Sequence, residues 1–415
     1  MNQEERPAPA VRRDLEIVPV VYEGERGFLV RDGLGLIEPP VVLQRDALAV
    51  LGLLDGRRSV RDVQLELIRR RGGSFVGTQA VEALVAELDA ARVLDSPGFR
   101  RARLRFVADY ARLDVREAVL AGSSYPAGAK ELADHLDRLL EGGDAGGPAA
   151  DPATACALVA PHIELETGKA VYARAYRAVR RLSPDRVVLL GTGHHLDDGF
   201  FSLTDKDFET PLGRVRTDRE AVAALRAAGG EAVSASDIAH RREHSLEFQL
   251  IFLQRLFGPS FSLVPILCGS FQHELGRASR PAEVPGVSGV VAALGDIIRS
   301  GGAKTFSVAG VDLSHIGPKF GHAEDAVSLL VEAREHDGAL IEAACRQDVA
   351  AFWRETRLNR DRTNVCGFSS LAVLLEAMPP VRGAKLGYEF WREEETRSAV
   401  SYAAILFERR DGRVE

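Results

Sequence analysis

Cysteine is scarce in this chain of 415 residues, which contains only Cys156, Cys268, Cys345 and Cys366. No two of them form a Cys-x-x-Cys pair, so the sequence argues against a disulfide framework and against a zinc ribbon. No stretch reaches the roughly eighteen uninterrupted apolar residues that a membrane-spanning helix needs. The first residues also lack the apolar segment of a secretory signal. We therefore expect a cytoplasmic protein of a reducing compartment that does not enter membranes.

An excess of basic charge is missing as well. The chain has 53 Lys and Arg against 60 Asp and Glu, a net charge of −7, and offers no polybasic surface for nucleic acid. Residues 1–115 contain 18 arginines, no lysine and 18 acidic residues, so the whole negative excess belongs to residues 116–415. Nine of the ten histidines and all four cysteines lie beyond residue 150. The length predicts two domains, and the second is expected to perform the chemistry.

The first segment combines short strands with helices. We expect strands at Leu15–Tyr22 and Gly27–Val30, then helices at Arg45–Leu54, Ser59–Arg71 and Thr78–Arg92. The middle helix opens on Ser59-Val60-Arg61-Asp62, a capping box. This pattern indicates a small α+β winged-helix-like domain, and its phrase LLDGRRSVRDVQLEL resembles the peptide-binding winged helices of the PqqD-like type. A structural or docking role is the alternative to peptide recognition, while the zero net charge disfavours DNA.

From Cys156 onward, short apolar runs alternate with helical stretches, which is typical of an α/β domain. We expect strands at Cys156–Ala160, Arg186–Leu190, Ser262–Leu267, Thr305–Val311 and Ala399–Leu406.

Three of these strands lead directly into polar residues. His162 follows the first, His194 and His195 follow the second, and Asp312 and His315 follow the fourth. Ligands of open α/β sheets bind at this carboxyl edge, so the sequence predicts a shared site there. At most one of His194 and His195 is expected to face it, since successive side chains of an extended strand point to opposite faces.

Two helix starts carry further candidates. Cys366 precedes an apolar helix at Ser370–Met378, and the positive end of the helix dipole favours the thiolate, which is the form that ligates metal or acts as a nucleophile. The other three cysteines fit packing roles. Glu243, His244 and Glu247 open an amphipathic helix, with both glutamates on one face. They either orient ligand imidazoles or form a solvated helix face.

The segments around these residues resemble the Memo family, known as protein B of the AmmeMemoRadiSam system and related in fold to class III extradiol dioxygenases. The matching phrases include AGSSYP (121–126), APH (160–162), LLGTGHH (189–195), REHSLEFQLIFLQ (242–254), GVDLSHIGPKFG (310–321), TNVCGFSSLAVLLEA (363–377) and AVSYAAILF (399–407). AGSSYP is the family's opening element, which places the domain boundary near residue 115. The resemblance implies an α/β fold, a sheet flanked by helices, in residues 116–415, preceded by the winged-helix-like domain of residues 1–115.

The resemblance also implies a mononuclear metal centre. The family's metal ligands match His162, His195 and Cys366. Two imidazoles and one thiolate leave coordination positions open, as in non-haem Fe(II) enzymes, so Fe(II) is the expected metal, with copper and zinc as alternatives. In that arrangement His194 faces outward or contacts a ligand from its outer side, and Glu243 is a further candidate for such an outer role or for an extra ligand.

Three more residues match polar groups near the family's metal: Asp312, His315 and His244. We expect His315 and His244 to move protons, since an imidazole titrates near neutral pH. Asp312 is expected to orient one of them.

The chain departs from the family at several positions. Leu120 and Ser124 stand where the family has His and Trp, and Phe368 stands where it has Arg. Glu164 and Glu166 follow the first ligand histidine and place carboxylates beside the metal, so Glu164 is a candidate extra ligand. The family's substrate therefore does not transfer to this chain.

These residues favour a metal-dependent, dioxygenase-like oxidoreductase that acts on a small-molecule or peptide substrate. The alternative is a non-catalytic protein that binds copper or iron, responds to redox state or recognises peptides. By resemblance, the expected partners are a radical-SAM protein and an AMMECR-type protein, and nucleic acid is not expected.

Overall fold

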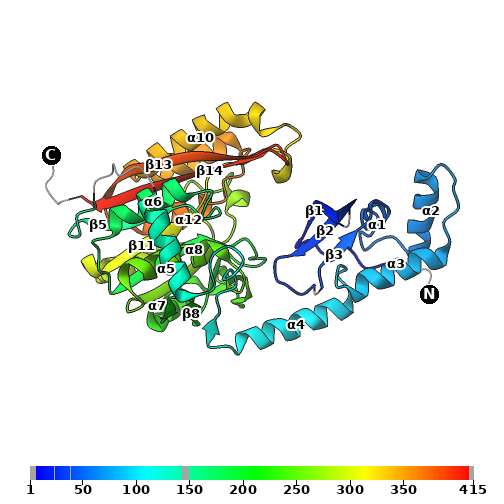
Figure 1. Ribbon diagram of the computed structural model, residues 1–415, viewed down its shortest axis with the longest axis horizontal. Coiled ribbons are helices and arrows are strands. Elements are labelled where there is room, and N and C mark those ends of the chain that lie inside the picture. The colour runs from blue at the N-terminus through cyan, green and yellow to red at the C-terminus, as the bar shows by residue number, and fades with distance from the viewer. Residues whose placement is uncertain (1–5, 23, 38, 143–148, 411–415) are drawn as a thin grey trace. The chain divides into compact units, whose positions relative to one another are not determined.

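The computed structural model describes residues 6–22, 24–37, 39–142 and 149–410. The chain divides into two compact units, Met1–Arg112 and Leu113–Glu415, each with its own hydrophobic core (Figure 1). Among the described helices, none has the length and apolar character needed to cross a bilayer.

In its described residues, the first unit pairs a three-stranded antiparallel sheet with four helices. Its elements are β1 Leu15–Tyr22, β2 Glu25–Asp32, β3 Val41–Leu43, α1 Arg45–Leu51, α2 Val60–Arg70, α3 Thr78–Ala90 and α4 Pro97–Ala111. The capping box is confirmed, because Ser59 accepts from the Asp62 amide and Asp62 accepts from the Ser59 amide. Helix α4 was not expected, since its arginine-rich sequence shows no clear apolar stripe.

The second unit contains eleven strands and eight α-helices among its described residues. The strands are β4 Val115–Arg116, β5 Ala155–Ala160, β6 Arg186–Thr192, β7 Phe201–Leu203, β8 Asp207–Thr210, β9 Gly213–Val215, β10 Ser262–Cys268, β11 Thr305–Gly310, β12 His315–Ile316, β13 Val381–Glu393 and β14 Ser398–Arg409. The helices are α5 Ala129–Glu141, α6 Lys169–Val179, α7 Arg219–Gly229, α8 His244–Phe257, α9 Val287–Ser300, α10 Ala326–Arg346, α11 Val349–Asn359 and α12 Phe368–Ala377.

A mixed eight-stranded sheet organises this unit. The strand order is β12-β14-β5-β11-β6-β10-β7, with β13 paired to β14. Strands β5, β11, β6 and β10 are parallel, so their carboxyl ends meet at one edge. Every residue of β5 and β11 is buried, as expected for central strands covered by helices on both faces. The predicted α/β class and the five predicted strands are confirmed.

Strand β13 was not expected from the sequence. It pairs with β14 in a long antiparallel hairpin, which Figure 1 shows beside α10. Most β13 residues are only partly buried, so the strand lacks the continuous apolar run by which β5 and β11 were recognised.

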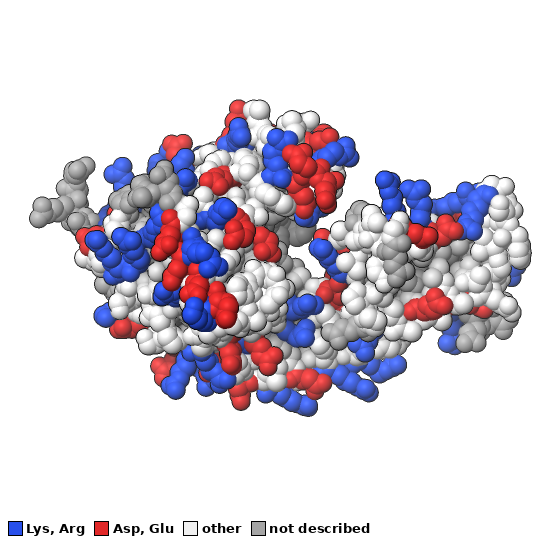
Figure 2. Space-filling model, viewed as in Figure 1, with Lys and Arg blue, Asp and Glu red and all other residues white. Residues whose placement is uncertain are grey.

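Acidic and basic side chains alternate over the visible face of the second unit (Figure 2). The described surface on that side therefore shows no broad field of one sign.

Candidate metal centre

Three imidazoles meet at the carboxyl edge of the parallel strands. His162 follows β5, His194 follows β6, and His244 is the first residue of α8. Their ligand-capable nitrogens all lie within 4.8 Å of one another. We call His162, His194 and His244 the histidine cluster. Cys366 Sγ lies 3.4 Å from His162 Nε2, so a thiol joins the three imidazoles.

His162 is held by the end of β11 and the residues that follow. Its Nδ1 lies 3.0 Å from the Gly310 carbonyl oxygen, and its backbone N–H donates to Asp312 Oδ1 at 2.9 Å. Because a carbonyl oxygen only accepts, Nδ1 carries the proton, and in the neutral ring Nε2 keeps its lone pair. That lone pair is on the side of Cys366, as a metal ligand requires.

His194 is held by a buried carboxylate. Its Nδ1 lies 3.0 and 3.1 Å from the two oxygens of Glu243, and its backbone N–H donates to Glu243 at 3.2 Å. Desolvation of the ring lowers the pKa of His194, but the charge of Glu243 and the hydrogen bonds with Cys366 and Glu243 together outweigh it and raise that pKa to about 9. His194 is therefore protonated at neutral pH in the metal-free protein, and ligation requires loss of its Nε2 proton.

Glu243 caps the amino terminus of α8. Its side chain accepts from the Ser245 amide at 2.9 Å, and Glu243 and Glu247 are both completely or almost completely buried. Burial raises the pKa of Glu243, but the neighbouring His194 and the hydrogen bonds lower it well below its usual range. The helix start is thus not a solvated face, and Glu243 is an ionised partner of His194.

His244 contacts the same carboxylate as His194 does. Its Nδ1 is 3.3 Å from Glu243 Oε1, and its ring stacks on that of His194 with 4.8 Å between centroids. Burial lowers the pKa of His244 well below its usual value, despite the charge of Glu243. His244 is therefore a neutral imidazole, and one of its ring nitrogens has a lone pair available to a metal ion.

Two glycines let α8 approach the sheet closely enough to bring His244 into the cluster. A Cβ on Gly191, in β6, would lie 2.4 Å from Ser245 Oγ. A Cβ on Gly310, at the end of β11, would lie 2.3 Å from the Ser245 carbonyl oxygen. The amino terminus of α8 therefore rests directly on the strand ends.

Cys366 lies two residues before α12. Its Sγ is 3.6 Å from the Asp312 carbonyl oxygen as well as 3.4 Å from His162. Burial raises the pKa of the Cys366 thiol, and the hydrogen bond from His194 does not reverse this. The expected thiolate is therefore not favoured in the metal-free protein, because burial of the thiol outweighs the hydrogen bond and charge of His194.

Two predicted site residues are not members of the histidine cluster. His195 is half-buried and its charge contributes to lowering the pKa of His244, but the ligand-capable nitrogens that lie within 4.8 Å of one another are those of His162, His194 and His244. Glu164 is exposed and accepts a hydrogen bond from Ser124 Oγ at 3.2 Å. The role of His195 as a ligand, implied by the family resemblance, stays a prediction.

Asp312 and His315 lie close to the cluster but contact different groups. Besides the His162 amide, Asp312 places Oδ2 3.7 Å from His162 Nε2. His315 Nδ1 is 3.0 Å from the Leu313 carbonyl oxygen. Burial lowers the pKa of His315 to about 4. The ring is therefore neutral at pH 7, with a proton on Nδ1 and a lone pair on Nε2.

Sequence reasoning missed Asp337, a fully buried carboxyl on α10. It accepts from Ser314 Oγ and Ser401 Oγ at 2.6 Å each and from the Tyr388 hydroxyl at 2.7 Å. These bonds fix the backbone just before His315. An acidic residue on the buried face of a helix was the available signal.

The position where the family has arginine does not line the site. Phe368 is fully buried, with its ring stacked against Phe352 at 5.7 Å and tilted against Trp353 at 5.0 Å between centroids. The phenylalanine is a core residue, so it supplies no contact to an anionic substrate.

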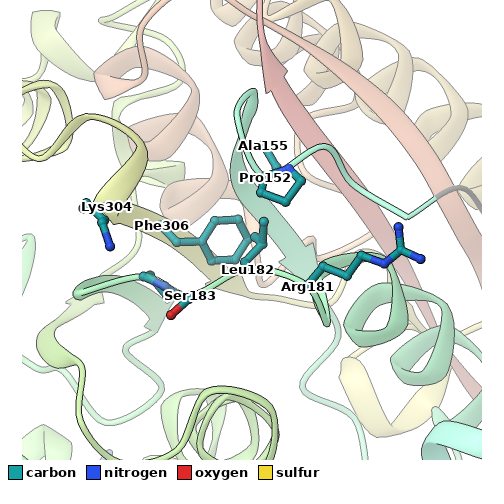
Figure 3. A pocket seen from close by; sticks show the side chains of 8 residues that line it. Pro152, Ala155, Arg181, Leu182, Ser183, Lys304 and Phe306 are labelled. Atoms are coloured by element: carbon teal, nitrogen blue, oxygen red, sulfur yellow. The ribbon is translucent and has the colours of Figure 1, made fainter.

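A pocket of about 230 Å³ lies at the opposite edge of the sheet, near the amino ends of β5, β6 and β11. Leu182 and Phe306 form an apolar wall, while the charged ends of Arg181 and Lys304 point away from each other (Figure 3). The pocket is thus separated from the histidine cluster by the length of the strands, and its cations do not converge on one ligand.

Fold and site together define a mixed α/β protein whose sheet carries a histidine- and thiol-lined site at its carboxyl edge. The sequence model of the Memo-like protein family matches residues 116–406, and the chain belongs to this family.

Several MEMO1 family proteins are similar to it. One from Aquifex aeolicus is 26% identical over 92% of this chain and 96% of its own length. One from Thermus thermophilus is 28% identical over 84% of this chain and 99% of its own length. One from Methanopyrus kandleri is 30% identical over 71% of this chain and 99% of its own length. Because the first unit is about a quarter of the chain, the Aquifex alignment extends through most of it.

Asp361, in the loop before Cys366, gives the second unit a testable pH dependence. Its carboxylate accepts from the Val365 amide at 3.0 Å, and burial raises its pKa from 3.8 to about 6. Ionisation of Asp361 is therefore less favourable in the folded state than in the unfolded state. The protonated carboxyl contributes its full share of the unfolding free energy below about pH 4, and this share is lost as the pH rises to about 6. Asp361→Asn keeps the acceptor and removes the titration.

We expect wild type to lose on the order of 2 kcal/mol of unfolding free energy, relative to Asp361→Asn, between pH 4 and pH 7. Urea unfolding followed by tryptophan fluorescence measures this for the second unit alone, because Trp353 and Trp391 are the only tryptophans. Parallel pH profiles for the two proteins would contradict the prediction.

Proposed function

We propose that this chain is a mononuclear metal protein and a metal-dependent oxidoreductase, with Fe(II) as the metal and copper or zinc as alternatives. The supporting observation is the histidine cluster, whose ligand nitrogens lie within 4.8 Å of one another, with Cys366 Sγ 3.4 Å from His162 Nε2. Imidazole and thiolate suit iron, copper and zinc, whereas magnesium and calcium prefer oxygen ligands. His162, His194 and Cys366 are the proposed ligands, with His244 completing the set.

Fe(II) bound by such ligands would supply oxidative chemistry with O₂ and a substrate. The chain's own residues prepare the site. The Gly310 carbonyl accepts a hydrogen bond from His162 Nδ1 and the Glu243 carboxylate accepts one from His194 Nδ1, so Nε2 of each ring is left for the metal. Neutral His315 is the proposed proton acceptor, at Nε2, because its Nδ1 is committed to the Leu313 carbonyl. The substrate is a small molecule or a peptide.

The same proposal assigns the first unit as a PqqD-like winged-helix module that binds a peptide. Its three-stranded sheet and helices α1–α3 support this. The further parts of the proposal are a dioxygenase-like fold relation, AmmeMemoRadiSam partners and a cytoplasmic location. Deleting residues 1–112 should abolish turnover of peptide substrates only, and turnover unaffected by the deletion would leave the unit a structural appendage.

Metal analysis tests the proposed centre. Protein reconstituted anaerobically with Fe(II) and desalted is expected to retain about one ion per chain, and Cys366→Ala is expected to retain markedly less. His273→Ala is the control, since His273 is exposed and not in the histidine cluster. Equal metal content in wild type and Cys366→Ala would overturn the site. Tight metal binding without O₂ consumption on any candidate substrate would favour the non-catalytic alternative.

A further inference from the structure

A buried ion pair is connected to the histidine cluster through Glu243. Arg116, in β4, and Glu247, in the first turn of α8, have side chains that are 1% and 0% exposed and form a salt bridge. Arg116 Nη2 also donates to the Glu243 carbonyl oxygen at 2.9 Å, and its Nε donates to the His240 carbonyl oxygen at 3.1 Å. One guanidinium therefore holds three points of the chain between residues 240 and 247.

The carboxylate of Glu247 accepts hydrogen bonds from several groups in addition to the ion pair. Besides Arg116, it accepts from the Tyr125 hydroxyl, from the Leu120 amide at 2.9 Å and from the Val119 amide at 3.3 Å. A buried carboxylate is tolerated only with such partners. The pair thus joins the opening segment of the second unit, residues 116–125, to the start of α8.

Glu243 connects this pair to the proposed metal ligands. Its backbone carbonyl is bound by Arg116, while its side chain binds Nδ1 of His194 and lies 3.3 Å from Nδ1 of His244. A displacement of the Glu243 backbone would therefore move the carboxylate that orients two imidazoles. The planar guanidinium fixes the direction of all its hydrogen bonds at once, which a lysine ammonium does not.

We infer that Arg116 is a positioning residue for the metal centre: its guanidinium, paired with Glu247, holds Glu243 in the place from which it orients His194 and His244. The inference rests on the proposed function only in one respect: the measurement of metal affinity requires that the chain binds a metal at this site. The orientation of His194 is a property of the metal-free protein and is measured separately.

The test uses variants of the full chain that leave no unpaired buried charge. Arg116→Met combined with Glu247→Gln removes the ion pair but keeps its volume and an acceptor for Tyr125. Arg116→Lys keeps the charge opposite Glu247 but cannot also reach the carbonyls of Glu243 and His240. The matched control is Arg12→Met with Asp32→Asn, which removes an equally buried pair, 1% and 2% exposed, from the first unit.

Two readouts are used, on proteins whose tryptophan fluorescence matches wild type. The hydrogen-bonded Nδ1–H proton of His194, observed by NMR in metal-free protein and identified by its loss in His194→Ala, is expected in wild type and the control and absent or weakened in both Arg116 variants. The Co(II) affinity, measured by visible absorption, is expected to fall about 10- to 100-fold in the double variant and about tenfold in Arg116→Lys.

An unchanged His194 proton in both Arg116 variants would overturn the inference. If the double variant does not fold, Arg116→Lys alone decides by the same two readouts. Absence of Co(II) binding by wild type would instead count against the proposed function, and the NMR signal would still decide the role of Arg116.

Discussion

Replacing His194 with alanine is expected to lower the affinity for Fe(II) or Co(II) by about 100-fold or more, because a direct ligand contributes more than the outer partners whose loss costs 10- to 100-fold. Replacing His195 with alanine is expected to lower this affinity less than His194→Ala does. The difference follows from geometry: the nitrogens of His194 lie within 4.8 Å of those of His162 and His244, and its Nδ1 is fixed by Glu243.

Chelator competition under anaerobic conditions measures both affinities. The two variants are matched, since each removes one imidazole from the same short segment. His273→Ala controls for the loss of a histidine elsewhere. If His195→Ala has the larger effect, the ligand set implied by the family resemblance is correct, and the metal-bound protein differs from the arrangement described for residues 193–196.

The placement of His194 illustrates what sequence alone does not predict. The alternation rule applies to an extended strand, but β6 ends at Thr192. Beyond it the Leu196 amide bonds back to the Gly193 carbonyl at 3.1 Å, which closes a turn. The direction of His194 is then set by that turn and by Glu243, about fifty residues away in sequence, so neither local periodicity nor spacing determines it.

The position of the site was predictable because it depends on strand ends. Buried parallel strands have continuous apolar sequences, and the polar residues that follow β5, β6 and β11 were visible at once. Arg116 was not recognised, since β4 has two residues and no pattern. Its role depends on distant partners on α8. The pKa of Cys366 was likewise misjudged, because burial is a property of the packed domain rather than of the helix start.

Substituting alanine for Gly310 is expected to have the largest effect on stability. The added Cβ would lie 2.3 Å from the Ser245 carbonyl oxygen and 2.8 Å from Gln249 Cγ. Neither contact is relieved by rotating a flexible side-chain end, so α8 must move away from β11. We expect a loss of about 3 kcal/mol in the unfolding free energy of the second unit, at the upper end of overpacking effects.

Gly338→Ala provides a control of opposite sign. Gly338 is exposed within α10 and has no atom within 4 Å of an added Cβ, so alanine there is expected to stabilise the unit by about 1 kcal/mol through helix propensity. Urea unfolding followed by tryptophan fluorescence measures both changes. The Gly310 carbonyl, at the end of β11, accepts the hydrogen bond from His162 Nδ1. Gly310→Ala should therefore also weaken metal binding in the fraction of the protein that remains folded. A Gly310→Ala protein with wild-type stability and affinity would show that α8 does not rest on β11 as described.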